Sequence, residues 1–147
     1  MSILTQLQAD LRQAMLAKDN LTRDTLRMAL AAIHNRQIEL RREPNDSDVL
    51  EVLNRQVKQR RESIEAYRAG GREESARSEE AEKKVLQAYL PAQLGEAEVE
   101  RIVRQVIHDS GVQSASEMGR VMGLVMPQLK GKAEGKLISE TVKRLLA

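Results

Sequence analysis

Cysteine, phenylalanine and tryptophan are absent from the 147 residues of this chain, and only Tyr67 and Tyr89 are aromatic. Without cysteine there is no disulfide, no thiolate nucleophile and no thiolate ligand for zinc or an iron–sulfur cluster. Leucine, valine, isoleucine, alanine and methionine are left to build the core, and this composition favours packed helices over sheets. We therefore expect an all-α protein.

Long apolar runs are missing as well. No stretch of about 18 apolar residues occurs, and Gln6, Gln8 and Asp10 interrupt the apolar residues near the N-terminus. The pattern contains neither a membrane-spanning helix nor the apolar core of a signal peptide. We therefore expect a protein that has no association with a membrane and is located in the cytoplasm.

Charge of one sign is not in large excess, since 24 basic and 22 acidic residues leave a net charge of +2. A net charge this small does not by itself imply a polyanionic partner. The distribution is more informative, because residues 120–147 contain 6 basic and 2 acidic side chains, whereas residues 92–119 contain 2 basic and 5 acidic ones. Positive charge therefore collects at the C-terminal end of the chain.

Apolar residues recur at every third or fourth position through most of the chain, which is the period of one helix face. In residues 1–91 this pattern predicts four helices, over residues 2–17, 21–42, 47–69 and 72–90. Pro44 prevents the second helix from continuing, and Asn45, Asp46 and Ser47 each offer a side-chain oxygen to cap the third. The fourth is densely charged, with the mixed acidic and basic residues typical of a solvated, ion-paired face.

Arg60 interrupts the apolar stripe of the third predicted helix. One interpretation is that its methylenes pack in the core while its guanidinium reaches water or a carboxylate at the surface. The other is that Arg60 contacts a partner molecule. The sequence favours the first interpretation and leaves the second open.

Residues 91–95, Pro-Ala-Gln-Leu-Gly, predict a linker, because proline disfavours helix in the residue before it and glycine relaxes the backbone after it. We place a boundary there, between an N-terminal helical subdomain of about four helices, residues 1–91, and a C-terminal subdomain, residues 92–147. Three apolar stripes predict three short helices in the second part, and Gly111 can terminate the first of them. Ser114 and Glu117 have the spacing of a capping box before the next.

Residue types that serve catalysis or metal binding are few and scattered. His34 and His108 lie far apart in the sequence and have no neighbouring ligands at metal-site spacing, so we interpret both as surface or boundary residues. Residues 131–137 are similar to a phosphate-binding loop, but one residue is missing between the glycines, and Leu137 stands where serine or threonine is needed. We therefore expect no catalytic residue, no metal site and no cofactor.

Basic residues surround this glycine-containing segment and continue along the helix after it. We predict that they bind the phosphate groups of a nucleic acid, with the contacts made by Lys130, Lys132, Lys136, Lys143 and Arg144. The alternative is a lysine-rich surface that only keeps the protein soluble, since no aromatic residue is available here to stack on bases.

Methionines at helical spacing precede this segment, at Met118, Met122 and Met126. We interpret them as core residues. The alternative is that they line a groove for a partner, because such a groove would show the same spacing.

Residues 116–146, SEMGRVMGLVMPQLKGKAEGKLISETVKRLL, resemble the signature of the GatB/YqeY family. The similar features occur in order: the Met-Gly-(basic)-Val-Met-Gly core, the Met-Pro pair, the Lys-Gly step and the Gly-Lys-Leu step. Upstream, residues 25–28, 58–64 and 89–91 resemble the N-terminal part of stand-alone YqeY-like proteins, so the resemblance extends over nearly the whole chain. It implies an N-terminal helical subdomain joined to a C-terminal three-helix subdomain.

The resemblance also implies a function. In the B subunit of the glutamine-dependent tRNA amidotransferase, the related tail helps to hold tRNA while misacylated Glu-tRNA or Asp-tRNA is amidated. This chain is too short to contain the catalytic part of that subunit, so a carbon–nitrogen ligase activity with glutamine as amido donor would be inherited from the family name only. We expect a tRNA-binding or adaptor protein whose partners are tRNA and a protein of tRNA-dependent amidation; the alternative is a protein–protein interaction module with no nucleic-acid role.

Overall fold

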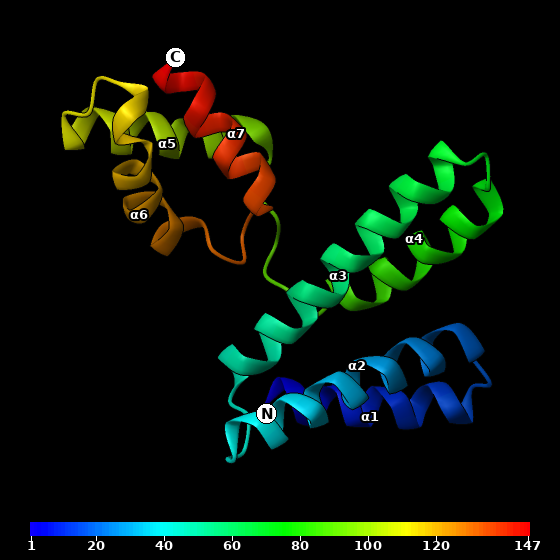
Figure 1. Ribbon diagram of the computed structural model, residues 1–147. Helices are drawn as coiled ribbons and strands as arrows, with labels where there is room; N and C mark the ends of the chain where they lie inside the picture. The colour runs from blue at the N-terminus through cyan, green and yellow to red at the C-terminus, as the bar shows by residue number, and fades with distance from the viewer. The chain divides into compact units, whose positions relative to one another are not determined.

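The computed structural model describes all residues from Met1 to Ala147 and contains seven α-helices and no strand (Figure 1). The prediction of an all-α protein is confirmed. The chain forms two compact units, Met1–Leu90 and Pro91–Ala147, and each is described below by itself. None of the helices combines the length and the apolar character that crossing a lipid bilayer requires.

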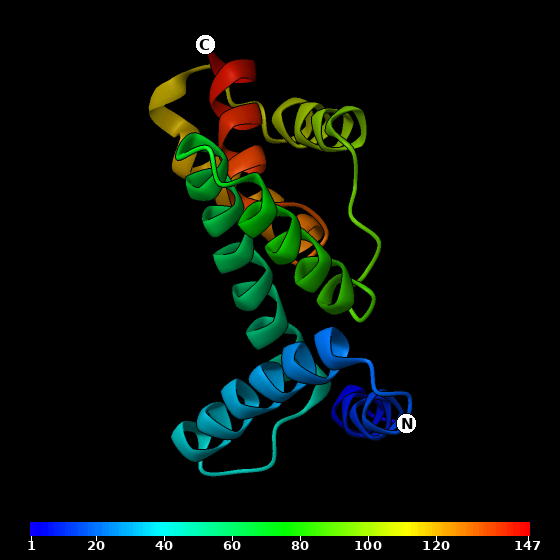
Figure 2. The same cartoon turned by 90° about the vertical axis from the view of Figure 1, so that its right-hand side faces the viewer.

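The N-terminal unit consists of two helical pairs, formed by α1 (Ile3–Leu16), α2 (Asn20–Leu40), α3 (Asp46–Ala69) and α4 (Glu73–Gln87). α3 and α4 lie side by side as a hairpin, as Figures 1 and 2 both show, and α1 packs along α2. The apolar stripes of the four helices meet in one core of Leu7, Leu26, Ala29, Ile33, Val49, Val52, Leu53, Val57 and Leu86. The periodicity in the sequence therefore marks the buried face of each helix.

Polar side chains cap the starts of α1, α2 and α3, whereas no side chain caps α4. Asn45 and Asp48 form a capping box at the start of α3, in which the Asn45 side chain accepts from the Asp48 N–H at 2.9 Å and the Asp48 carboxylate accepts from the Asn45 N–H at 2.9 Å. The side chain of Ser2 accepts from the N–H of Thr5 at the start of α1. Of the three cap residues that the sequence offers, Asn45 caps the third helix, whereas Asp46 and Ser47 lie within its first turn.

Arg60 lies inside the N-terminal unit with only 5% of its surface exposed. Its Nε is 3.5 Å from a carboxylate oxygen of Glu82 on α4, and its Nη1 donates to the side-chain oxygen of Gln56 at 3.0 Å. The guanidinium therefore reaches a carboxylate, but within the protein and not at its surface. Burial raises the pKa of Glu82, and the neighbouring Glu79 adds to this effect, whereas Arg60 opposes it. A partner contact by Arg60 is excluded by its burial.

The acidic run at the start of α4 forms ion pairs with neighbouring basic side chains. Glu73 pairs with Arg77 at 3.7 Å, and Glu80 pairs with Lys83 at 2.9 Å. These contacts confirm the predicted ion-paired face. At the other end of α4, the Tyr89 hydroxyl donates to the carboxylate of Asp10 on α1. Burial first, and this hydrogen bond second, raise the pKa of Tyr89 well above its usual range.

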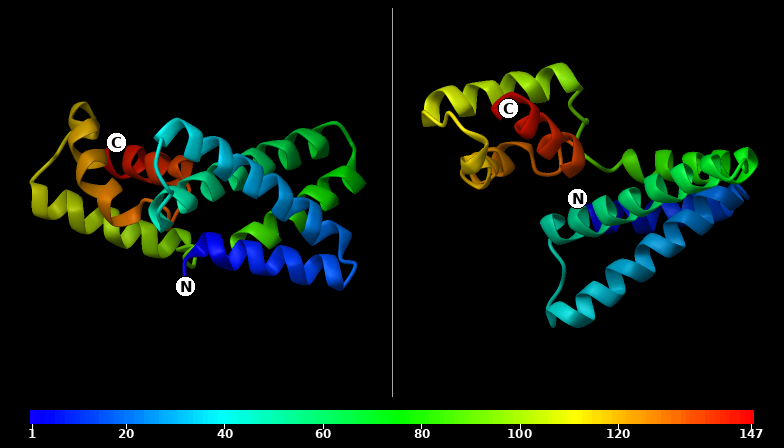
Figure 3. Two further views of the ribbon diagram at one scale, coloured as in Figure 1. Left: turned by 90° about the horizontal axis from the view of Figure 1, so that it is seen from below. Right: turned by 45° about the horizontal axis from the view of Figure 1, so that its top comes forward.

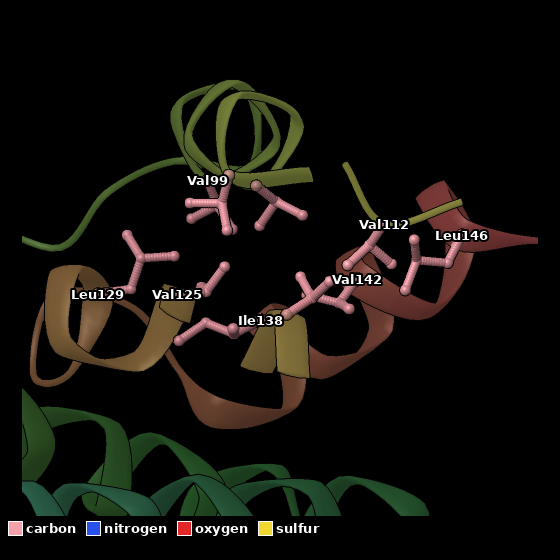
Figure 4. Close-up of a cluster of buried hydrophobic side chains, with 10 residues drawn as sticks. Val99, Val112, Val125, Leu129, Ile138, Val142 and Leu146 are labelled. Atoms are coloured by element: carbon pink, nitrogen blue, oxygen red, sulfur yellow. The ribbon is translucent and has the colours of Figure 1, made fainter. Parts of the chain in front are cut away.

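The C-terminal unit contains α5 (Glu96–Ser110), a short 3₁₀ turn (Ala115–Glu117), α6 (Met118–Leu129) and α7 (Gly135–Leu146). Its core consists of Val99, Val103, Val106, Val112, Val121, Val125, Leu129, Ile138, Val142 and Leu146. Figure 4 shows Val99 of α5, Val125 of α6 and Ile138 of α7 pointing toward one another. Three short helices thus close around one aliphatic core, which no aromatic residue supplements.

Two predicted helix boundaries in this unit have different outcomes. Gly111 ends α5 in a left-handed conformation with φ +72°, as expected, and its N–H donates to the carbonyls of Ile107 and His108. The capping box of Ser114 and Glu117 is wrong, because neither side chain caps α6. The Ser114 hydroxyl instead lies 2.7 Å from the hydroxyl of Ser116, and the backbone between them enters a 3₁₀ turn before the helix starts.

The C-terminal unit should fold by itself, and residues before α5 should contribute to its stability. Leu94 packs against the core of this unit, and its N–H donates to the carbonyl of Lys132 at 2.7 Å. We expect a fragment of residues 91–147 to be helical, and a fragment of residues 96–147 to have a free energy of unfolding lower by about 1–2 kcal/mol. Urea unfolding followed by circular dichroism would measure both. A disordered 91–147 fragment would show that the unit depends on the rest of the chain.

Candidate nucleic-acid interface

The predicted contact residues gather where the chain passes from α6 to α7. Lys130 leaves the helix in an extended conformation, and Gly131 then adopts φ +79°, a left-handed value that favours glycine. The N–H groups of Lys132 and Ala133 both donate to the carbonyl of Leu129, at 2.9 and 3.2 Å. We call residues 130–136, this turn and the first residues of α7, the lysine loop.

The three lysine side chains of the lysine loop are exposed to solvent and have no carboxylate partner. Lys130, Lys132 and Lys136 are all exposed, and none of them forms an ion pair. Lys143 is also exposed and unpaired, and it lies seven residues after Lys136 on the same outer face of α7, about 10 Å further along the helix. The structure therefore brings three of the predicted contacts together at the loop and extends the positive charge along one helix face.

Arg144 differs from the lysines because it already has a partner. Its Nη2 is 3.2 Å from a carboxylate oxygen of Glu100 on α5, and Arg104 contacts the same carboxylate at 2.7 Å. The hydrogen bond from Arg104 first, and that from Arg144 second, lower the pKa of Glu100. Glu140 is exposed on the face between Lys136 and Lys143 and reduces the positive potential there. Arg144 is thus the weakest of the five candidates for a phosphate contact.

The N-terminus of α7 adds a second source of positive potential. No side chain caps this end, since Glu134 occupies the N-cap position without forming a cap hydrogen bond. The N–H groups of the first helical turn then lack side-chain acceptors, and the helix dipole favours an anion at this end. Backbone amides and lysine side chains at the lysine loop could therefore bind the same phosphate.

One feature of the loop is not visible in the sequence. Gln93 lies 38 residues before Gly131 in the chain, yet its side-chain amide donates to the Gly131 carbonyl at 3.0 Å. Together with the bond from the Leu94 N–H to Lys132, this places part of the predicted linker against the lysine loop. A periodic pattern reports which helix face is buried and contains no information on a contact of this kind.

The remaining candidates from the sequence do not form a site. His34 and His108 are both exposed and belong to different units, which confirms that they are surface residues. The three methionines of α6 are half-buried and pack against the core of the C-terminal unit, so their interpretation as core residues is confirmed. Gly119 and Gly123, on the exposed side of α6, have open space where a Cβ atom would lie, and no contact within the unit requires glycine at either position.

A second surface feature lies in the N-terminal unit, where α2 and α3 diverge toward the loop that joins them (Figure 3, right). The cleft between them has a volume of about 220 Å³ and is lined by Ala32, Asn35, Arg36, Glu39, Val52, Arg55, Gln56 and Gln59. Arg36 pairs with Glu39 at 2.9 Å, whereas Arg55 is exposed and has no ion pair. The cleft therefore combines a small apolar floor with one free guanidinium.

The chain is similar over nearly its whole length to one protein family. A family model described as Yqey-like protein matches residues 4–146. The chain is 32% identical over 150 residues, 98% of its own length and 81% of the relative's, to Altered inheritance of mitochondria protein 41, mitochondrial, of Pyrenophora tritici-repentis. It is 40% identical over 90 residues to the protein of the same name from Eremothecium gossypii, but this match spans only 49% of that relative.

The names of these relatives contradict the cytoplasmic location predicted above, because the proteins are described as mitochondrial. The prediction rested on the lack of a membrane-spanning helix and of a signal-peptide core in the sequence. Neither absence identifies a compartment, so neither distinguishes the cytoplasm from the mitochondrion.

Proposed function

The chain belongs to the family of Yqey-like proteins, and from this membership and the lysine loop we propose that it binds tRNA without catalysing a reaction. The observation that carries the proposal is the group of lysines at the lysine loop, which are exposed and unpaired beside an uncapped helix N-terminus. Each lysine that neutralises a phosphate releases a condensed counterion, which supplies affinity independent of base sequence.

The chemistry of this surface favours the backbone of the nucleic acid over its bases. Neither tyrosine lies in the C-terminal unit, so no aromatic side chain is available there for stacking. Recognition would then depend on the shape of a folded RNA, with its phosphates at the positions that the lysine loop can reach. A tRNA, which presents closely spaced phosphates on a rigid surface, meets this requirement.

The resemblance to the tail of the amidotransferase B subunit supports the same proposal. In that subunit the related segment holds tRNA, while other parts of the enzyme perform the amidation. We propose an equivalent adaptor role here, in which a protein of tRNA-dependent amidation supplies the chemistry and this chain contributes a contact with the RNA.

Filter binding of labelled tRNA over a series of salt concentrations tests the proposal. If the four unpaired lysines each meet a phosphate, the logarithm of the binding constant should fall with the logarithm of salt concentration with a slope of about −3. The variant Arg55→Gln, which removes one exposed charge from the N-terminal unit, serves as control and should bind as the parent does. Absence of tRNA binding at low salt, or binding that is insensitive to salt, would refute the proposal.

The cleft between α2 and α3 favours a second candidate, a protein–protein interaction module with no nucleic-acid role. Met28 does not line the cleft, but it is 58% exposed and lies one turn before Ala32 on the same face of α2, so it offers an apolar side chain near the cleft. A partner segment with an apolar side chain and a carboxylate would match Met28 and Arg55. This candidate predicts that Arg55→Glu abolishes partner binding, whereas the loop lysines do not matter.

A further inference from the structure

The segment that follows Leu90 is joined to the lysine loop by two hydrogen bonds. The Nε2 of Gln93 donates to the carbonyl of Gly131 at 3.0 Å, and the N–H of Leu94 donates to the carbonyl of Lys132 at 2.7 Å. The same Nε2 also lies 3.3 Å from the carbonyl of Pro91. Leu94 is anchored in turn, because its side chain packs against the core of the C-terminal unit.

We infer that Gln93 and Leu94 form a clamp that fixes the lysine loop. Gln93 is uncharged and remote in sequence from the loop, and it acts as a positioning residue for anion binding by Lys130 and Lys132. The role in binding rests on the tRNA-binding function proposed above, whereas the clamp itself does not.

The loop has few other constraints in this region. Gly131 is conformationally permissive, the bonds to the Leu129 carbonyl fix the base of the turn, and Ala133 packs against the core of the C-terminal unit. The two carbonyls held by the clamp belong to residues 131 and 132, at the middle of the turn. A flexible turn would lose conformational entropy when its lysines are ordered on an anion, and a turn ordered in advance avoids that loss.

The clamp also changes the extent of the predicted linker. Gln93 and Leu94 are bonded to the C-terminal unit and cannot move independently of it while these bonds persist. Within residues 91–95, the part before the clamp is therefore reduced to Pro91 and Ala92, both of which are exposed. By thermodynamic linkage, an anion that orders the lysine loop must also stabilise the clamp.

Hydrogen exchange and tRNA binding by the full chain test the inference together. Gln93→Met keeps the length of the side chain and cannot donate, and Gln105→Met is the matched control, because the Gln105 amide is exposed and donates only to Asp109 of its own helix. In Gln93→Met we expect amides of residues 130–136 to exchange several-fold faster. The affinity for tRNA should fall about 2- to 10-fold, with the salt slope unchanged since no cation is removed. In the parent, tRNA should slow exchange of the Leu94 amide.

Each result has a defined meaning. Equal exchange of the loop amides in Gln93→Met and the parent would overturn the clamp. Faster exchange with unchanged affinity, or with a reduced salt slope, would overturn the positioning role. If the parent does not bind tRNA, the positioning role falls with the proposed function, and the exchange of residues 130–136 still decides whether the clamp exists.

Discussion

Replacing Lys130, Lys132 and Lys136 together with glutamine is expected to weaken tRNA binding on the order of 100-fold at 0.1 M salt. Each phosphate contact contributes about 0.7–0.9 to the exponent of the salt dependence, so the loss of three contacts should reduce the slope by about 2–3. The three side chains are exposed and unpaired, so their replacement leaves the core of the C-terminal unit and its ion pairs intact.

Filter binding over a salt series would measure this effect, and far-ultraviolet circular dichroism would verify that the variant keeps its helices. Arg144→Gln is the matched control within the same unit. Because Arg144 shares the carboxylate of Glu100 with Arg104, its replacement should weaken binding less than that of any one loop lysine. A triple variant that binds tRNA as tightly as the parent at every salt concentration would place the contact elsewhere.

Helix positions and core faces could be predicted from the sequence because both depend on local periodicity. The stripes through Val99 and Val103 of α5, and through Ile138 and Val142 of α7, are buried as the spacing requires. Gly111 was identifiable as a helix end because a residue in the left-handed conformation is most often glycine.

Features that depend on contacts between distant segments could not be predicted. Periodicity placed Arg60 on the core face of α3, but it gave no indication that Glu82 lies opposite on α4. The capping-box spacing of Ser114 and Glu117 failed because the same side chains can hydrogen-bond within a turn, and here a 3₁₀ turn precedes α6.

For the candidate site, exposure of the lysines followed from their place outside the apolar stripes. The pairing of Arg144 with Glu100 did not, because these two residues lie 44 positions apart in the sequence, on different helices. The same limit applies to Gln93, whose interaction with the lysine loop appears only when the chain is folded. The sequence thus indicated which residues are charged, but it did not indicate that Glu100 pairs with Arg144 or that Gln93 contacts the lysine loop.

The buried pair of Arg60 and Glu82 provides the largest expected effect on stability. Arg60→Ala removes packed methylenes and leaves a carboxylate without its cation, a change that costs about 3–5 kcal/mol for a fully buried pair. The Glu82 side chain keeps 26% of its exposure and can regain some hydration. We therefore expect the free energy of unfolding of the N-terminal unit to fall by about 2–4 kcal/mol.

Two further variants separate packing from charge. Arg60→Met keeps the apolar volume, so its cost should arise from the unpaired carboxylate and, to a smaller extent, from the lost hydrogen bond to Gln56. Burial already raises the pKa of Glu82 in the folded state, and without Arg60 it should rise further. The unfolded state of Arg60→Met then binds fewer protons than the folded state, so the stability of this variant falls as pH rises. Below the ordinary pKa of glutamate, its free energy of unfolding should approach that of the parent. This stability should be lost as pH rises through the pKa of Glu82 in the folded state.

Adding Glu82→Gln to Arg60→Met removes the unpaired carboxylate charge, so the double variant should regain most of the parent's stability at neutral pH. Glu82→Gln alone leaves a buried guanidinium without its carboxylate and should be destabilising. Urea unfolding of the parent, both single variants and the double variant completes the cycle. If the effects of the two single changes are additive, Arg60 and Glu82 are not coupled, and the burial of Arg60 would then have to be explained by packing of its methylenes alone.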